Sequence, residues 1–192
     1  MHFFADAIAL KHPRASYWFR PTDLSARKLD PRVRSWLDDQ GSLTKRLMGF
    51  CPGKFSVRVL SQYWVRAEIE ESRLLQISPR QKVLLRQVQL LCGDRVCVYA
   101  RSLIPLKTLK GKHQRLRYLG VRPLGAYLFA NPRLRREQQH LARVTQQDPL
   151  FEIALSGSAR RGEQIWGRRS LFTIDRKLLL VSEFFLPALF EK

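Results

Sequence analysis

The stretch from Trp166 to Pro187 reads W-G-R-R-S-L-F-T-I-D-R-K-L-L-L-V-S-E-F-F-L-P. Two runs of strand-forming residues flank a polar break at Asp175-Arg176-Lys177, a pattern that predicts a β-hairpin. The second run, Leu178 to Leu186, is apolar on both faces except at Ser182 and Glu183. A strand with two apolar faces is normally central in its sheet and covered on both sides. We therefore expect this hairpin to occupy the middle of a sheet.

Glu183 is the exception within that apolar strand. Burying a carboxylate without a partner is strongly unfavourable. The carboxylate must therefore pair with a cation, be protonated, or take part in the function of the protein. Two interpretations stay open at this point: a structural ion pair, and a functional carboxylate.

A second strand, predicted over Lys82–Cys92, carries an arginine on its more apolar face. Alternation places Leu84, Arg86, Val88 and Leu90 on one face, and Leu85, Gln87, Gln89 and Leu91 on the other. The two glutamines indicate that the second of these faces is the more solvent-exposed one. A core-facing arginine usually has a carboxylate partner or binds an anion. The alternative is that its stem lies along the core while its head reaches solvent.

The rest of the chain predicts helices followed by antiparallel hairpins. We expect helices after the caps Asp30 and Ser42, strands at Phe55–Val59, Tyr63–Ile69 and Val96–Ile104, a short helix over Gly125–Phe129, a polar basic helix over Arg133–Val144, and a strand at Phe151–Leu155. Little βαβ alternation is present, so the pattern indicates an α+β fold on a single antiparallel sheet. Residues 1–20 read as an N-terminal extension and residues 21–192 as one domain.

Composition describes an ordinary globular protein. The chain has 192 residues, of which 45% are hydrophobic and 27% charged. No apolar run approaches the roughly 20 residues that span a bilayer, and the first residues do not resemble a signal peptide. Three cysteines do not describe a disulfide framework. We therefore expect a cytoplasmic protein with reduced cysteines, including Cys92 and Cys97, which flank a tight turn.

The formal net charge of +19 favours an anionic partner. Nucleic acid, an anionic membrane surface and an anionic small molecule are the three candidates. The basic residues are spread along the chain, without zinc-finger spacing, an RNP motif or a polybasic tail. The sequence also lacks CxxC, HExxH, GxSxG and glycine-rich phosphate motifs. We accordingly expect no metal and no cofactor.

Several segments together resemble the chorismate pyruvate-lyase family. They are D-P-R-V-R-S-W-L from Asp30, S-L-T-K-R from Ser42, L-R-Q-V-Q-L-L-C, A-R-S-L-I-P from Ala100, L-G-V-R-P-L-G-A-Y-L-F from Leu119, W-G-R-R-S, and L-L-L-V-S-E-F-F-L-P. Each alone is weak, but they follow the family's order and cover most of residues 30–188. The resemblance implies a single antiparallel sheet with helices covering one face and the active site.

The resemblance also implies an activity and site residues. Family members convert chorismate to 4-hydroxybenzoate and pyruvate at the start of ubiquinone biosynthesis, without metal or cofactor. The family's arginine for the product carboxylate falls on Arg86, and its buried glutamate near the product hydroxyl falls on Glu183. A backbone contact to the product falls on Leu124. Leu43 stands where the family has an apolar pocket residue, methionine in its best-known form.

Chorismate carries a second carboxylate, which needs its own cation. The candidates are Lys45, Arg46, Arg101, Arg168 and Arg169, with Arg168 and Lys45 preferred. We expect a monomer that binds chorismate, does not bind nucleic acid and associates weakly with anionic membrane surfaces. Two alternatives remain: a ligand-sensing domain of the same fold without lyase chemistry, and a basic nucleic-acid-binding protein.

Overall fold

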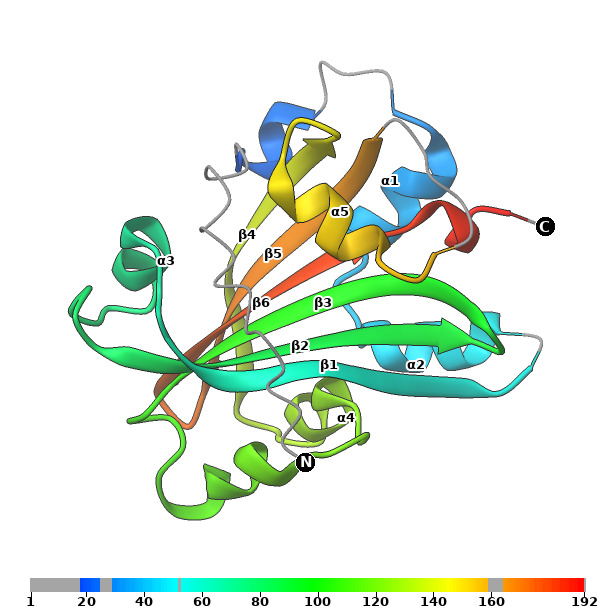
Figure 1. The fold of residues 1–192 in the computed structure, drawn as a ribbon. Helices are drawn as coiled ribbons and strands as arrows, with labels where there is room; N and C mark the ends of the chain where they lie inside the picture. Colours follow the sequence, from blue (N-terminus) through cyan, green and yellow to red (C-terminus); the bar gives the residue numbers. More distant parts are fainter. Residues whose placement is uncertain (1–17, 25–28, 52, 159–163, 192) are drawn as a thin grey trace, which may run out of the picture.

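A computed structural model describes residues 18–24, 29–51, 53–158 and 164–191 (Figure 1). They fold around a six-stranded antiparallel sheet with the strand order β1-β2-β3-β6-β5-β4. The strands are β1 (Phe55–Arg66), β2 (Lys82–Cys92), β3 (Arg95–Pro105), β4 (Leu134–Thr145), β5 (Gln164–Ile174) and β6 (Lys177–Phe185). The predicted α+β fold on a single antiparallel sheet is confirmed.

The predicted central hairpin is confirmed as β5 and β6. β6 pairs with β3 on one side and with β5 on the other, which explains why its sequence is apolar on both faces. The turn consists of Asp175 and Arg176, with φ values of 48° and 62°. Two positive φ values are typical of the tight turn whose twist matches that of the strands.

Helices cover both faces of the sheet (Figure 1). One face packs against α1 (Pro31–Asp38), α2 (Leu43–Phe50), α4 (Leu124–Phe129) and the 3-10 helix η2 (Gly111–Tyr118). The other face packs against α3 (Ile69–Leu74) and α5 (Pro149–Leu155). Short 3-10 helices, η1 (Pro21–Leu24) and η3 (Pro187–Leu189), complete the elements.

The two predicted helix caps are confirmed. The Asp30 carboxylate accepts a hydrogen bond from the Arg32 backbone N–H at 2.8 Å. The Ser42 hydroxyl accepts one from the Lys45 N–H at 3.4 Å. Each cap satisfies a backbone donor that has no partner inside its helix.

The predictions for Phe55–Val59 and Tyr63–Ile69 were wrong in detail. One continuous strand, β1, runs from Phe55 to Arg66, and its pairing with β2 shifts register between Val59 and Ser61. The bulge at this point moves the apolar alternation by one residue, which made one bent strand look like two. Ile69 begins α3 instead of ending a strand.

The prediction of a helix over Arg133–Val144 was wrong. This segment forms β4, an edge strand that pairs only with β5 and the isolated bridge residue Phe19 among the described residues. Edge strands often carry many charges, because charges oppose pairing with a further chain. The polar composition of this strand therefore hid the alternation of apolar and polar residues that identifies a strand. Pairing with β5, and not local propensity, makes the segment a strand.

The prediction of a strand at Phe151–Leu155 was also wrong, because these residues belong to α5. The Asp148 carboxylate caps this helix through the Leu150 N–H at 2.8 Å, and Pro149 occupies the first helical turn. α5 covers Gln89, which is 1% exposed and donates to the Ser156 carbonyl. Gln89 is therefore buried, contrary to our expectation for this face of β2, whereas Gln87 is half-buried.

The predicted extension, residues 1–20, lies mostly outside the described residues. Of its last residues, Phe19 is 6% exposed and exchanges two backbone hydrogen bonds with Leu141 of β4, each 2.8 Å long. The domain boundary itself stays a prediction.

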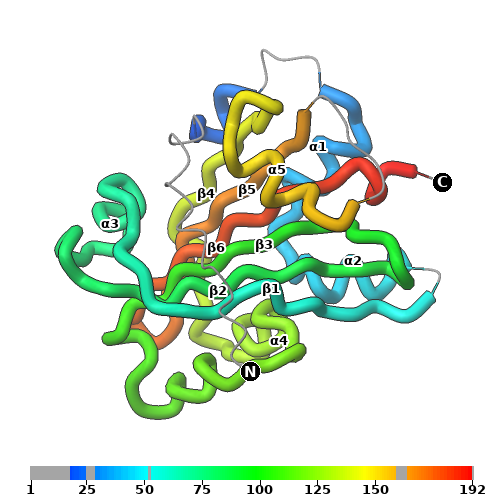
Figure 2. The backbone as a smooth tube through the Cα atoms, viewed as in Figure 1, coloured from blue at the N-terminus to red at the C-terminus, as the bar shows by residue number. Residues whose placement is uncertain are grey.

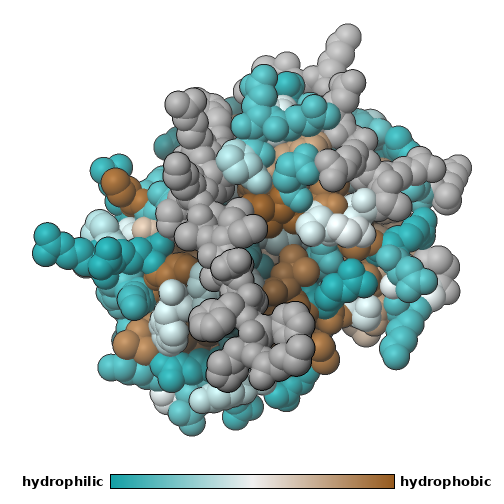
Figure 3. Space-filling view, viewed as in Figure 1, coloured by the Kyte–Doolittle hydropathy of each residue, from teal (hydrophilic) through white to brown (hydrophobic). Residues whose placement is uncertain are grey.

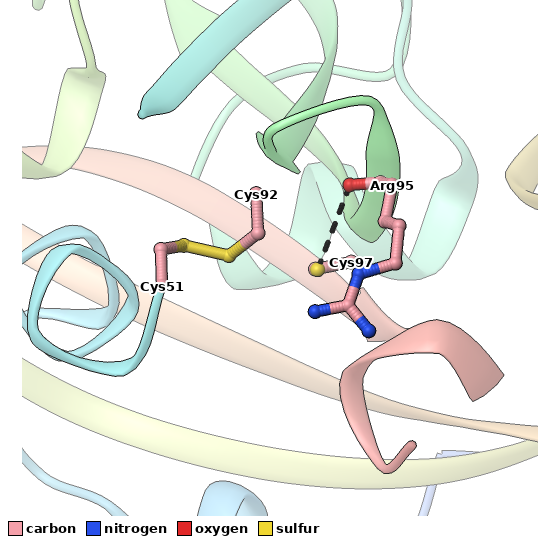
Figure 4. Close-up of a disulfide and its surroundings, with 4 residues drawn as sticks. All are labelled: Cys51, Cys92, Arg95 and Cys97. Carbon is pink, nitrogen blue, oxygen red and sulfur yellow. Dashed lines mark hydrogen bonds between the residues drawn. A yellow bond between two sulfur atoms is a disulfide. The ribbon is translucent and has the colours of Figure 1, made fainter. Parts of the chain in front are cut away.

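The expectation of reduced cysteines was wrong for two of the three. Cys51, which directly follows α2, and Cys92, which ends β2, form a disulfide with Cα atoms 5.3 Å apart (Figure 4). Forty-one positions separate them in sequence, so only the docking of α2 on the sheet brings them together. Cys97 is a buried free thiol, and burial raises its pKa.

A polar cluster ties η2 and α4 to the β5–β6 turn. His113 is buried and bonds Tyr127 at 2.8 Å and Asp175 at 2.9 Å. A hydrogen bond from Lys112 is the main cause that lowers the pKa of Asp175, and burial lowers the pKa of His113 despite the carboxylate. The chain path in Figure 2 runs from β3 through this region into β4.

Among the described residues, no helix has the length and apolar content needed to cross a membrane. On the face of the molecule seen in Figure 3, which carries α3 and α5, hydrophobic residues gather near the centre and hydrophilic ones towards the rim.

Gly167 offers a test of the central hairpin. A Cβ at this position would lie 2.7 Å from the ring of Phe184, its partner across the hairpin. We expect Gly167→Ala to lower the free energy of unfolding by about 1–3 kcal/mol, because a well-packed core resists added volume. Urea unfolding measures the change. Gly49→Ala in α2 is the control, since its Cβ would meet nothing within 4 Å; equal losses in both variants would contradict the close-packing explanation.

Candidate active site

A cavity lies between the sheet and the elements α2 and α4. The strands contribute Val57, Arg86, Val88, Leu90, Ala100, Ser102, Arg136, Phe172, Val181 and Glu183, and the covering segments contribute Gly41, Leu43, Thr44, Pro123, Leu124, Gly125, Leu128 and Phe129. An apolar enclosure with a few convergent charged groups is the usual form of a small-molecule site.

Strand register brings the two principal predicted residues onto one face. Arg86 of β2 lies opposite Ser102 of β3, and Glu183 of β6 lies opposite Ala100 of β3. Ser102 and Ala100 are two positions apart, so their side chains point to the same side. Two strand spacings and two residue steps put the Cα atoms of Arg86 and Glu183 ~12 Å apart. A small aromatic molecule with a polar group at each end fits between such side chains.

Arg86 is buried without a carboxylate among its described partners. It is 2% exposed, and its Nη2 donates to the Gly120 carbonyl at 2.7 Å and to that of Arg122 at 3.4 Å. Nη1 makes a 3.4 Å bond to the Gln62 amide oxygen, and the buried Nε has no described partner. Burial lowers the pKa of Arg86. Arginine remains charged at neutral pH even so, which leaves a desolvated cation facing the cavity.

Glu183 forms an ion pair with Arg168 of the neighbouring strand. The Nε and Nη2 atoms of Arg168 lie 2.9 and 2.7 Å from Oε2 of Glu183. Within the described part of the chain, Oε1 of Glu183 accepts no hydrogen bond. The ion pair engages Oε2 and leaves Oε1 without a described partner in a side chain that lines the cavity, so a structural and a functional role of Glu183 are compatible.

Arg168 is fully buried and all three of its nitrogens are engaged. Its Nη1 donates to the carbonyls of Trp36, at 3.1 Å, and Asp39, at 2.5 Å. These carbonyls lie at the C-terminal end of α1, which favours a positive charge. Arg168 does not line the cavity; it holds Glu183 and the end of α1.

Asp39 organises the loop between α1 and α2. Burial alone would raise the pKa of its carboxyl group, but hydrogen bonds from the Gly41 N–H and the Arg46 guanidinium outweigh burial and lower it. The corresponding distances are 2.8 Å and 3.2 Å. The ordered loop presents Gly41 to the cavity and the Asp39 carbonyl to two arginines, Arg168 and Arg136.

Leu43 and Leu124, both predicted site residues, line the cavity from the first turns of α2 and α4. The two helices meet at these ends. A Cβ on Gly125 would lie 2.8 Å from Oγ1 of Thr44, so glycine permits the close approach. The two helix ends form a shared cover over the cavity.

The remaining predicted cations do not line this cavity. Lys45 is exposed. Arg46 is paired with Asp39, Arg101 with Glu71 at 2.5 Å, and Arg169 with Glu70 at 2.6 Å. Arg101 and Arg169 project from the opposite face of the sheet.

Sequence reasoning missed Arg136, which does line the cavity. Arg136 was missed because the segment Arg133–Val144 was predicted to be a helix. A helix would not pair with β5, so nothing in that prediction placed Arg136 at the cavity. In β4, Arg136 pairs with Phe172, and its guanidinium carbon lies 5.1 Å from the centre of that ring. Burial is the main cause that lowers the pKa of Arg136, and the charge of Arg168 acts in the same direction.

In the parts of the chain that the structure describes, no group of three or more His, Cys, Asp or Glu residues could hold a metal ion. The expectation that the protein needs no metal stays a prediction.

Comparison with known proteins agrees with this geometry. The family model described as chorismate lyase matches residues 12–192. A protein of Azoarcus sp. (strain BH72) named "Probable chorismate pyruvate-lyase" is 40% identical over 186 residues, which cover 94% of this chain and 96% of that protein. A protein of the same name from Methylococcus capsulatus is 41% identical over 156 residues, 81% of this chain and 95% of the relative.

Similar solved structures share the fold. The ligand-binding domain of a putative GntR-family transcriptional regulator from Bordetella bronchiseptica has a TM-score of 0.53 at 20% identity, covering 70% of this chain and 86% of that one. PhnF from Mycobacterium smegmatis has a TM-score of 0.56 at 11% identity, covering 78% and 65%. The match to the family model extends over nearly the whole chain and includes every strand that lines the cavity, so this protein is a member of the chorismate lyase family.

Proposed function

We propose that this protein is a chorismate pyruvate-lyase that converts chorismate to 4-hydroxybenzoate and pyruvate without metal or cofactor. The observation that carries the proposal is the environment of Arg86. It is a buried cation whose described partners are neutral oxygens, and it faces a cavity shared with Glu183. A buried charge of this kind calls for an anionic ligand.

The reaction needs little covalent work from the protein. The bond between the ring carbon and the ether oxygen breaks, and its electron pair goes to the departing enolpyruvate. The neighbouring ring carbon, which bears the hydroxyl group, loses its proton, and the ring becomes aromatic. The enolpyruvate takes a proton at its methylene carbon to become pyruvate. Aromatisation drives the reaction, so positioning and charge stabilisation should supply most of the catalysis.

Each cavity residue has a proposed part in this reaction. Arg86 binds the ring carboxylate through charge-assisted hydrogen bonds. Oε1 of Glu183 contacts the ring hydroxyl or takes the adjacent proton. The backbone of Leu124 contacts the aromatic product, and Leu43 packs against the ring. Arg168 positions Glu183 through the ion pair on Oε2.

The ligand-sensing alternative rests on the similarity to the GntR-type domains, which concerns the fold. Turnover separates the two functions. We expect the pure protein, treated with a chelator, to release pyruvate and a new aromatic ultraviolet band from chorismate. Binding without turnover would favour the sensing domain. Activity that disappeared with the chelator and returned with a divalent ion would contradict the metal-free mechanism.

Arg86→Ala tests the proposed carboxylate ligand. Loss of a charge-assisted contact should weaken binding by on the order of 2–4 kcal/mol. We expect lower affinity for both chorismate and 4-hydroxybenzoate, measured by kinetics and calorimetry. Arg66→Ala, which removes an exposed charge from β1, is the matched control. Unchanged affinity in a folded Arg86→Ala protein would remove this residue from the site.

Glu183→Gln tests the proposed reacting carboxylate. Turnover by the folded protein should fall about 10²–10⁴-fold if Glu183 takes a proton, and roughly tenfold if it only positions the hydroxyl group. Because the amide also leaves Arg168 without its carboxylate, we expect unfolding to become easier by about 3 kcal/mol. Single-turnover kinetics and urea unfolding measure the two effects separately.

Glu71→Gln is the control for the cost of breaking an ion pair. Glu71 is 5% exposed and pairs with Arg101 on the other face of the sheet. This variant should lose stability and keep its turnover. Full turnover in folded Glu183→Gln would mean that Glu183 is structural only.

We propose further that the protein is a cytoplasmic monomer acting in ubiquinone biosynthesis, and that it does not bind nucleic acid. Thiol-based reductants keep most cytosolic cysteines reduced. In that compartment the Cys51–Cys92 pair would stay in contact, since its Cα atoms are held 5.3 Å apart by the packing of α2 on β2.

The high positive charge also supports weak association with anionic membranes. Residues 106–122 contain six Lys or Arg and no Asp or Glu. In the same segment Tyr118 is 72% exposed and Val121 is 68% exposed. Basic side chains beside exposed apolar ones suit an anionic lipid surface.

Vesicle sedimentation tests this association. We expect binding to vesicles that contain phosphatidylserine, little binding to phosphatidylcholine vesicles, and a loss with Tyr118→Ser/Val121→Ser. Leu60→Ser/Tyr63→Ser in β1 is the control for removal of exposed apolar side chains. Equal binding to both vesicle types, or stronger binding to duplex DNA than to vesicles, would contradict the proposal.

A further inference from the structure

The cavity contains a second cation that the proposed function has not yet used. Arg136 projects from edge strand β4, whereas Arg86 projects from β2, and strands β3, β6 and β5 lie between them. The two guanidinium groups therefore enter the cavity from opposite sides. A ligand with a single carboxylate has no evident need for both.

The donors of Arg136 are unevenly used. Its Nη1 donates to the Gln40 side-chain oxygen at 2.8 Å, to the Asp39 carbonyl at 3.3 Å and to the Gln139 side-chain oxygen at 3.5 Å. Its Nε is buried without a described partner, and its Nη2 makes no hydrogen bond to any described residue. Nη1 thus anchors the group, while the Nε–Nη2 edge remains available.

That edge is the one with which arginine binds a carboxylate by two parallel hydrogen bonds. The neighbouring Arg168 shows the arrangement within this protein, since its Nε and Nη2 atoms both contact Glu183. Arg136 has no such carboxylate among the described residues, and it packs against the ring of Phe172, which also lines the cavity.

The position of Arg136 matches the position of the leaving group. Arg136 shares the Asp39 carbonyl with Arg168, which holds Glu183, so Arg136 belongs to the Glu183 end of the cavity. In chorismate the enolpyruvyl ether is attached next to the hydroxyl-bearing carbon, at the end of the ring remote from the ring carboxylate. A molecule that presents its ring carboxylate to Arg86 and its hydroxyl to Glu183 carries the second carboxylate on this side.

We propose that Arg136 binds the enolpyruvyl carboxylate of the substrate through its Nε–Nη2 edge. This inference rests on the proposed lyase function and assigns the second carboxylate to Arg136 instead of Arg168 or Lys45. Arg168 has its donors engaged by Glu183 and the end of α1, and Lys45 is exposed outside the cavity. The same guanidinium lies where it stabilises the negative charge that develops on the departing enolpyruvate.

A distinguishing consequence is that Arg136 recognises the substrate but not the aromatic product. 4-Hydroxybenzoate keeps the ring carboxylate and loses the other one with pyruvate. For Arg136→Gln we expect kcat/KM for chorismate to fall about 10–100-fold, as for a lost two-bond carboxylate contact. The affinity for 4-hydroxybenzoate should change less than about threefold. Arg86→Ala should weaken both.

Equilibrium binding makes the test independent of turnover. The probes are 4-hydroxybenzoate and 3-(carboxymethoxy)-4-hydroxybenzoate, an aromatic dicarboxylate that cannot react. The parent protein should bind the dicarboxylate more tightly than the monocarboxylate, and Arg136→Gln should abolish this preference. Arg136→Lys, which keeps the charge but lacks the two-donor edge, should recover only part of it.

Arg135→Gln is the matched control, because Arg135 is the exposed neighbour on the same strand and loses the same charge. It should retain the parent preference. Equal weakening of both probes by Arg136→Gln, or an unchanged preference for the dicarboxylate, would overturn the assignment. If the parent protein binds both probes as expected but does not convert chorismate, the lyase function fails and the carboxylate subsite stands.

Discussion

The ion pair between Arg168 and Glu183 connects the centre of the sheet, the end of α1 and the wall of the cavity. It joins the two central strands across the hairpin, and through Nη1 of Arg168 it also holds the end of α1. Arg168 is fully buried and the Glu183 side chain is 15% exposed, so each charge would be costly alone, and together they satisfy one another. The arrangement engages Oε2 of Glu183 and leaves Oε1 without a hydrogen bond from any described residue, in a side chain that lines the cavity. In the proposed mechanism, the structural and chemical roles of Glu183 are divided between its two carboxylate oxygens.

Charge in the cavity follows a simple pattern. Arg168 is neutralised by Glu183, whereas Arg86 and Arg136 are held mainly by neutral oxygens. The site therefore carries two uncompensated positive charges, which equals the charge of a dianionic substrate with opposite sign. In the proposed mechanism, one of these charges loses its partner when one carboxylate leaves with pyruvate. The proposed charge balance therefore favours the substrate over either product taken alone.

Part of this site could be predicted from the sequence because it depends on strand alternation. Glu183 was conspicuous in a strand with two apolar faces, and Arg86 lay on the apolar side of its own strand. Arg136 could not be found in this way. β4 is an edge strand, and its many charged residues hide the alternation of apolar and polar positions. The helix α5 was missed although Asp148-Pro149 is a standard helix start, because the apolar run that follows is as short as a strand. The Cys51–Cys92 contact depends on the docking of α2, which no local pattern encodes.

The helix α2 is attached at one end and merely in contact at the other. Its last turn is linked covalently to β2 through Cys51, and its first turn, with Leu43 and Thr44, rests against Gly125 of α4. A rotation of α2 about the disulfide would displace its N-terminal end more than its C-terminal end. The N-terminal end, with Leu43 and Thr44, is also the end of α2 that lines the cavity. Such a rotation would separate Thr44 from Gly125, so the Cys51–Cys92 bond restrains the movement that would open this side of the cavity.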